Sequence, residues 1–209
     1  MNFIPQSIGS PSESACAPRA KPNPPLVRTY RASAMAALAA TLTFLSACQS
    51  MPAKPPLAQP RIDLARYMGD WYVIASIPTW LERDAHDAVE TYKQREDGKI
   101  ATTFTYRKNA TATALEEMTP LGTVVDTGSN AVWTMQFIWP FEADYRILHV
   151  DPAYREVVVG RQKRDYVWIM SRTPSMPEAD YQRLVAFVAT QGYDVAKLRK
   201  VPQRAAGAR

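Results

Sequence analysis

The stretch Tyr67-Met68-Gly69-Asp70-Trp71-Tyr72 decides how this 209-residue sequence is interpreted. Its glycine allows the chain to bend tightly, and the alternating run at residues 70–76 that follows is typical of a β-strand. If the tryptophan faces inward, Val73 and Ala75 should face inward too, because side chains alternate along a strand. A buried indole at the start of the first strand predicts a closed, aromatic end to the core.

Short alternating runs, rich in β-branched and aromatic residues, continue downstream with turn signals between them. Eight strands are predicted, at residues 70–76, 87–95, 100–107, 118–125, 131–138, 144–150, 156–161 and 166–171. Asp97-Gly98 predicts a two-residue hairpin turn in which both central residues have positive φ. Pro140 should end the fifth strand, because proline cannot donate to a ladder.

One segment after residue 80 predicts a helix, at residues 178–191. Pro177 stands at its start and Gly192 follows its end, positions that favour these residue types. Its apolar stripe falls at helical spacing and consists of Tyr181, Leu184, Val185 and Val188. The eighth strand is apolar on both faces, so this helix should cover its outer face. Eight antiparallel strands and a helix fit a barrel or a sandwich, and periodicity alone does not choose between them.

Four motifs in consistent order resemble lipocalins, in particular the bacterial branch and its relatives apolipoprotein D and the plant temperature-induced lipocalins. They are Gly-x-Trp-Tyr at residues 69–72, VDPAYR at 150–155, RDYVWIMSRTP at 164–174 and QGYDVAK at 191–197. The resemblance implies an all-β fold, an eight-stranded antiparallel up-and-down β-barrel with one C-terminal α-helix packed on the outside. It also implies that Gly69, Trp71 and Arg172 form a structural signature in which the arginine lies across the indole.

The first 61 residues predict an export signal and a membrane tether, and not a folded domain. Residues 1–47 are predicted to be a disordered leader and signal peptide, because basic residues precede a charge-free apolar stretch too short for a membrane span of about 20 residues. Leu45-Ser46-Ala47-Cys48 resembles a lipobox, which implies acylation of Cys48; the alternative is an ordinary signal peptide with a chance cysteine. Residues 48–61 then form a proline-rich tether, residues 62–203 the barrel and helix, and residues 204–209 a flexible tail.

Alternation also assigns the inward faces of three strands. The predicted ligand-binding residues are Thr102, Phe104, Tyr106, Trp133, Met135, Phe137, Tyr166 and Trp168. Such an aromatic lumen suits an apolar ligand held by area burial. The resemblance implies a fatty acid or a lysophospholipid as the ligand class. Arg107, Arg146 and His149 are candidates for contact with a ligand headgroup at the rim; the alternative is that each is simply exposed to solvent.

Other function classes find little support. From Cys48 onward, 21 basic residues face 19 acidic ones without a basic stripe, so we expect no nucleic-acid binding. The two cysteines precede the core, so we expect no metal and no cofactor. Ser171 has no histidine partner in its sequence context. His86 lies near Asp84 and Asp87, but such a grouping is expected by chance in a loop rich in charged residues. The sequence contains no catalytic motif.

We therefore expect a binding protein and not an enzyme, held at the outer membrane through Cys48 and facing the periplasm. Gln49 after the cysteine points, by resemblance, to the outer membrane. Three alternatives stay open: a structural envelope lipoprotein with a filled barrel that binds partner proteins, carriage of haem or a pigment, and association of two copies into a homodimer.

Overall fold

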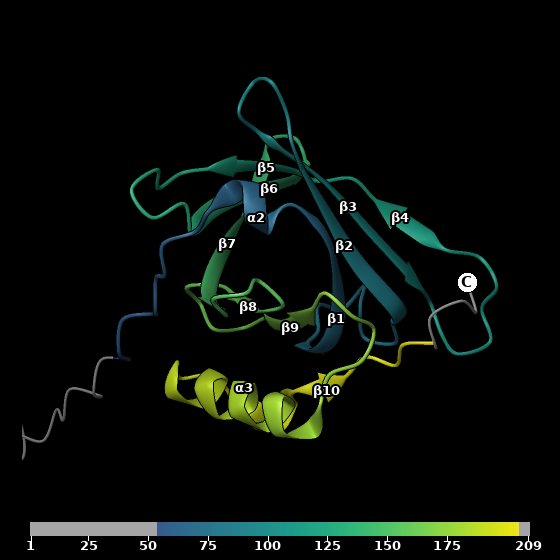
Figure 1. Ribbon diagram of the computed structural model, residues 1–209. Helices are drawn as coiled ribbons and strands as arrows, with labels where there is room; N and C mark the ends of the chain where they lie inside the picture. The colour runs from purple at the N-terminus through teal and green to yellow at the C-terminus, as the bar shows by residue number, and fades with distance from the viewer. Residues whose placement is uncertain (1–53, 205–209) are drawn as a thin grey trace, which may run out of the picture. The chain divides into compact units, whose positions relative to one another are not determined.

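A computed structural model describes residues 54–204 of the chain. The predicted leader, the signal peptide, Cys48 and all but the first residue of the predicted tail lie outside the described residues. Figure 1 shows a sheet curled around a core, with helix α3 against its outside. Among the described residues, no helix is long and apolar enough to cross a membrane.

The described strands form one antiparallel sheet that closes on itself. They are β1 (Gly69–Ile77), β2 (His86–Gln94), β3 (Ile100–Arg107), β4 (Glu116–Met118), β5 (Leu121–Val124), β6 (Val132–Ile138), β7 (Phe141–Val150), β8 (Glu156–Gly160), β9 (Val167–Ser171) and β10 (Arg199–Lys200). Each barrel strand pairs with the next along the chain, and β9 pairs back with β1. Strand β10 adds to β1 at Ala75 and Ser76. Because β4 and β5 together supply the fourth strand, the prediction of an eight-stranded antiparallel barrel is confirmed.

Two local predictions are wrong. The predicted strand at residues 118–125 is divided between β4 and β5, because Pro120 has no N–H for the ladder; its carbonyl still accepts the Thr102 N–H, at 3.1 Å. In the hairpin between β2 and β3, only Gly98 has positive φ, at 77°. The Arg95 N–H donates to the Lys99 carbonyl, so the turn is a longer loop closed by a glycine and not a two-residue turn.

One end of the barrel is closed by Trp71. Helix α2 (Leu64–Tyr67) precedes β1, and the Tyr67 carbonyl accepts the Trp71 indole N–H at 2.8 Å. The Arg172 guanidinium lies 3.7 Å from the centre of the indole ring. It donates to the carbonyls of Arg66, Tyr67, Met68, Asp70 and Tyr154. Gly69, with φ of 93°, turns the chain from α2 into β1.

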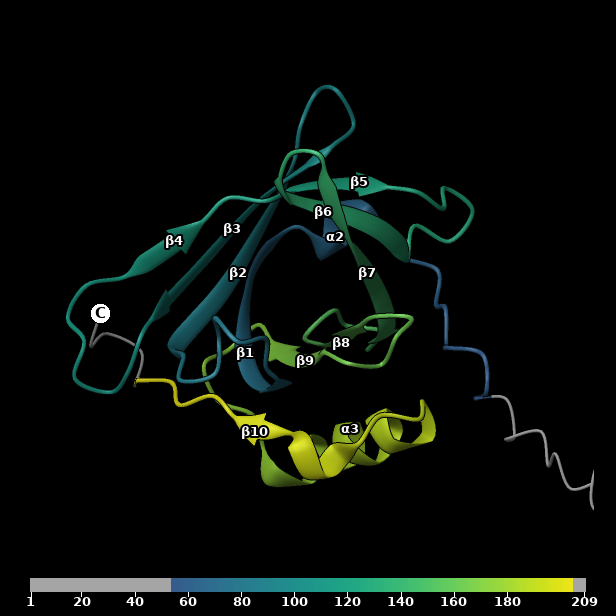
Figure 2. The same cartoon turned by 180° about the vertical axis from the view of Figure 1, so that it is seen from behind.

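A second hydrophobic cluster lies on the outside of the barrel, beneath helix α3 (Glu178–Thr190). Val167 and Ile169 of β9 pack there against Tyr181, Leu184 and Val188 of the helix. Trp168 and Met170 of β9 face the interior. The predicted helix and its position over the last strand are thus confirmed; Figure 2 shows α3 on the side of β8 and β9, with β10 next to β1.

The prediction that Ala75 faces inward is wrong. It lies in the outer cluster, whereas Val73 lies in the interior cluster. The register of β1 against β9 shifts between these two residues, which marks a bulge. A bulge inserts one residue and reverses the phase of the side chains after it.

Before helix α2, residues 54–61 run along the outside of the barrel. The Pro55 carbonyl accepts a hydrogen bond from Arg164, in the loop between β8 and β9. The Ala58 N–H donates to the Gln191 side chain at 2.7 Å, and the Gln59 side chain donates to Ser129 in the loop between β5 and β6. Residues 54–204 lie within one compact unit that contains every described strand and both hydrophobic clusters, so this part has a complete core and can fold alone.

Candidate ligand-binding site

The half of the barrel away from Trp71 encloses a cavity of about 260 Å³. This volume is close to the lower end of small-molecule sites, about 300 Å³, and suits a slender ligand. Its wall comes from the strands and from two loops at the open end. The lining residues are Thr79, Trp80, Leu81, Glu82, Glu90, Thr102, Phe104, Met118, Pro120, Met135, Phe137, Ala143, Asp144, Tyr145, Arg161, Tyr166 and Trp168.

Most of the predicted ligand-binding residues lie on this wall. Those that line the cavity are Thr102, Phe104, Met135, Phe137, Tyr166 and Trp168. Tyr106 is buried but does not line the cavity; its ring stacks on Phe104 with 5.1 Å between ring centres. Trp133 also lies outside the lining. It packs below the cavity, stacked on Tyr145 at 5.1 Å, and its indole donates to the Asn130 carbonyl.

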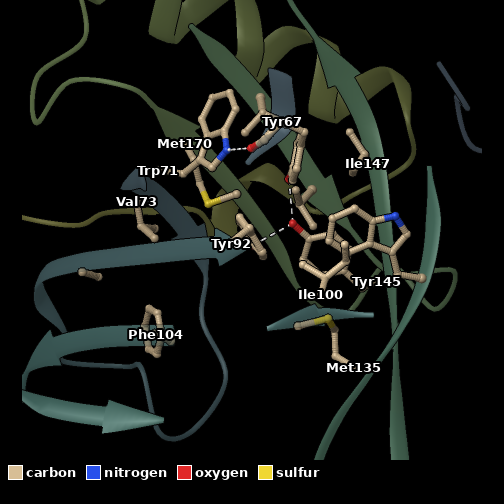
Figure 3. Packing of buried hydrophobic residues seen from close by; sticks show 14 of the residues in the cluster. Tyr67, Trp71, Val73, Tyr92, Ile100, Phe104, Met135, Tyr145, Ile147 and Met170 are labelled. Carbon is tan, nitrogen blue, oxygen red and sulfur yellow. Dashed lines mark hydrogen bonds between the residues drawn. The ribbon is translucent and has the colours of Figure 1, made fainter. Parts of the chain in front are cut away.

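The floor beneath the cavity is a packed group of aromatic rings whose hydroxyl groups are linked. Figure 3 shows Tyr67, Tyr92 and Tyr145 together with Trp71. The Tyr145 hydroxyl lies 2.7 Å from that of Tyr67 and 2.8 Å from that of Tyr92, and the Tyr92 hydroxyl donates to the Glu90 carboxylate. Burial raises the pKa of Tyr67 and of Tyr145, so these hydroxyls stay neutral. The chain of hydroxyls therefore ends at a carboxyl on the cavity wall.

Of the three carboxyl groups that line the cavity, those of Glu82 and Glu90 have a raised pKa. Burial, with a smaller contribution from the charge of Glu82, raises the pKa of Glu90 to about 8. Burial also raises the pKa of Glu82, whose carboxylate accepts the Trp168 indole N–H at 3.0 Å. Because the charged form is penalised where water is scarce, burial favours the protonated form of Glu90. It can then donate a hydrogen bond as well as accept one.

The other two charged residues that line the cavity, Asp144 and Arg161, interact in part with neighbouring side chains. Asp144 accepts two hydrogen bonds from Arg146, at 2.9 and 3.1 Å, and one from the Gln162 N–H. Arg161 lies with its guanidinium 5.2 Å from the centre of the Tyr166 ring, and its Nε is 3.6 Å from Asp165. That Nε is buried and has no hydrogen-bond partner among the described residues. Arg161 therefore supplies a donor at the cavity edge.

The three candidates for a headgroup contact interact with other parts of the barrel. Arg107 forms a buried ion pair with Asp87 at 3.2 Å. Arg146 lines a groove on the outside of the barrel, beside residues 56–59. His149 lies against Phe187 of helix α3, with 5.3 Å between ring centres. None of the three lines the cavity.

The residues considered for catalysis do not form a site. The His86 imidazole contacts the Asp84 carbonyl at 3.0 Å, while the Asp87 carboxylate is paired with Arg107 and Arg204. The Ser171 hydroxyl contacts that of Thr173. Within residues 54–204, no cluster of three His, Cys, Asp or Glu residues could hold a metal ion.

Sequence reasoning missed Glu82 and Glu90. For Glu90 a signal was present, because Ala88, Glu90 and Tyr92 share one face of β2 and the two neighbours belong to the interior cluster. A carboxylate between two inward residues of a strand points to the lumen. Glu82 lies in the loop between β1 and β2, where alternation gives no information. Arg161, the last residue of the predicted strand at residues 156–161, also lines the cavity.

Comparison with known families decides the identity of this barrel. A model of the Lipocalin-like domain family matches residues 62–203. This chain is a lipocalin. The lipocalin family binds small hydrophobic ligands, and its members are generally binding and transport proteins.

Named relatives of this lipocalin come from plants, bacteria and animals. Temperature-induced lipocalin-1 of Arabidopsis thaliana is 34% identical, over 68% of this chain and 80% of the relative. Outer membrane lipoprotein Blc of Escherichia coli K12 is 30% identical, over 79% of this chain and 94% of the relative. Apolipoprotein D of Macaca fascicularis is 27% identical, over 71% and 80%.

Solved structures agree on the fold. Insecticyanin from the tobacco hornworm Manduca sexta superposes on this lipocalin with a TM-score of 0.57, at 15% identity, over 74% of this chain and 88% of that chain. The cockroach allergen Per a 4 superposes with a TM-score of 0.54, at 20% identity, over 72% and 94%. At these identities the structures support the barrel alone.

Proposed function

We propose that this lipocalin binds one slender lipid, a lysophospholipid or a fatty acid, in its barrel at the bacterial envelope. The observation that carries the proposal is the apolar cavity between the aromatic floor and the open end of the barrel. Its rings and the flexible side chains of Met118 and Met135 suit an acyl chain of variable shape. The proposal includes no catalytic step.

The polar groups of the cavity favour the lysophospholipid of the two classes. Glu82 and Glu90 would repel a fatty-acid carboxylate when they are charged, and only Arg161 offers a positive charge on the wall. A protonated Glu90 can instead donate to an ester or hydroxyl oxygen. We infer that ester and hydroxyl groups are bound better than a free carboxylate.

The proposed location is the periplasmic face of the outer membrane, with Cys48 acylated. Its support is the lipobox-like sequence at residues 45–48 and the similarity to a relative named as an outer membrane lipoprotein. Two or more acyl chains would anchor the protein stably.

Calorimetric titration of a fragment that starts at Gln49 tests ligand binding. The probes are a lysophosphatidylcholine below its critical micelle concentration and palmitate. We expect saturable one-to-one binding of both, tighter for the lysophospholipid. Ala143→Phe, which adds a ring inside the cavity, should weaken binding by about tenfold or more. Ala110→Phe, on the exposed loop after β3, should not.

Two results would contradict the proposal. A folded, delipidated fragment that binds neither lipid would mean that the interior does not accept a ligand, and the filled structural barrel would then be the better explanation. Equal binding by Ala143→Phe and the unsubstituted fragment would place the ligand outside the cavity.

A further inference from the structure

The open end of the barrel carries a concentration of exposed apolar side chains. In the loop between β1 and β2, Trp80 is 75% exposed. At the turn between β6 and β7, Ile138, Trp139 and Phe141 are 73%, 80% and 75% exposed. Single exposed apolar residues are ordinary, but a group of this kind on one end of a molecule marks an interaction surface. We call these four residues, with Leu81 and Phe137, the apolar rim.

The apolar rim is continuous with the cavity. Trp80, Leu81 and Phe137 are exposed and also line the cavity. The rim thus forms the mouth through which a ligand reaches the interior. Whatever covers the rim also covers this mouth.

The path of the chain indicates what covers it. The loop between β8 and β9 lies at the open end, because Arg161 and Tyr166 of that loop line the cavity. The Arg164 side chain of the same loop donates a hydrogen bond to the Pro55 carbonyl. Cys48 precedes Lys54 by six residues, which span at most about 21 Å when fully extended. The acyl chains proposed for Cys48 would therefore keep the open end, and not the closed end, close to the membrane.

The charge of the rim also suits a lipid surface. The exposed charged residues of the rim loops and of the loop between β8 and β9 are Arg83, Asp84, Glu142, Lys163 and Asp165, so both signs are present and nearly balance. Such a surface neither requires anionic lipid nor is repelled by it. Tryptophan side chains favour the headgroup region of a bilayer, where an apolar ring meets water.

We propose that the apolar rim inserts into the surface of a lipid bilayer, so that the cavity mouth opens onto the membrane. A ligand could then pass between bilayer and barrel without crossing water. The choice of a bilayer over a protein partner rests on the acylation of Cys48 proposed above. Insertion itself depends on the rim, and it should persist in a fragment that lacks this cysteine.

Flotation with phosphatidylcholine vesicles tests the proposal, with the fragment that starts at Gln49. Some of the lipid carries bromine on its acyl chains, which quenches inserted tryptophan. We expect the fragment to float with the vesicles, to lose tryptophan fluorescence, and to do both at high and low salt. The variant Ile138→Ser, Trp139→Ser, Phe141→Ser should bind vesicles at least about tenfold more weakly. Val125→Ser changes an exposed residue in the loop between β5 and β6 and is the control.

The three substituted residues do not line the cavity, so the variant should still bind lysophosphatidylcholine in solution. The two assays therefore test the two proposals separately. Vesicle flotation tests insertion of the apolar rim, and calorimetric titration with lysophosphatidylcholine tests ligand binding in the cavity. The rim proposal is overturned if the fragment does not float, or if the triple variant floats as well as the control. It is also overturned if the fragment is a dimer without vesicles and the triple variant is a monomer, because a second copy would then cover the rim.

Discussion

Replacing Glu90 by glutamine should change how the stability of the barrel depends on pH. In the folded protein, burial raises the pKa of Glu90 from its ordinary value of 4.5 to about 8. Between these values the unfolded chain loses its proton and the folded chain keeps it, so the free energy of unfolding falls as pH rises. The full shift would correspond to about 5 kcal/mol. Because Glu90 borders an open cavity, we expect less than half of this, about 2 kcal/mol.

Urea unfolding of the fragment from Gln49, measured in steps from pH 5 to pH 8.5, gives this free energy. The wild-type curve should fall relative to that of Glu90→Gln by about 2 kcal/mol across the window, since glutamine does not titrate. The difference in free energy of unfolding should therefore shift in favour of the variant as the pH rises to 8. Glu117→Gln, an exposed position on β4, is the matched control and should follow the wild type. Glu82→Gln should lower the pKa of Glu90, because it removes a neighbouring negative charge.

Parallel curves for wild type and Glu90→Gln would refute the reasoning. They would mean that the carboxyl is as well solvated in the folded barrel as in the unfolded chain. A difference that grew towards low pH would reverse the sign and would show that the folded state favours the charged carboxylate. Either result would also remove the support that Glu90 gives to binding of an ester or hydroxyl group.

Three further substitutions test the parts of the barrel that surround the cavity. Arg172→Ala removes a guanidinium that covers Trp71 and donates to five carbonyls, so thermal unfolding should show a loss of about 3 kcal/mol; Arg172→Lys should restore only part of it. Trp133→Ala should lower the free energy of unfolding by about 3–5 kcal/mol, because the ring is fully buried in the floor. Gly160→Ala places a methyl group 2.1 Å from the Tyr193 hydroxyl, which itself bonds to Arg161, and urea unfolding should show a loss of about 1–3 kcal/mol. A loss below about 0.5 kcal/mol in any of these would contradict the packing described.

The strands of the barrel were predictable because their inner and outer faces carry different types of side chain, which alternate along the sequence. On β9, the alternation of Trp168 and Met170 with Val167 and Ile169 correctly indicated a strand covered on both sides. The prediction failed where one residue reversed the alternation of side chains along a strand or interrupted the hydrogen bonds between two strands. The bulge after Val73 turned Ala75 outward, and Pro120 divided the fourth strand, although its own position in the sequence was a signal.

The cavity wall was predicted in part, for a different reason. Alternation identifies residues that face the interior, but it does not say how far along the barrel axis packing ends and the cavity begins. Trp133 and Phe137 share a face of β6, yet Trp133 lies in the packed floor and Phe137 at the open mouth. The loop containing Glu82 could not be placed, because loops carry no periodic pattern. Such a position follows only from the tertiary structure.

The division of the barrel interior into a packed floor and a hollow upper half has a consequence for how this protein can evolve. Trp71, Arg172, Tyr67 and Tyr92 stabilise the closed end and do not line the cavity. Phe104 and Met135 line the cavity and also belong to the interior cluster, so a substitution there changes the ligand wall and the core packing together. Cargo preference can therefore drift most readily at exposed wall residues such as Trp80 and Phe137, where a substitution removes little buried packing.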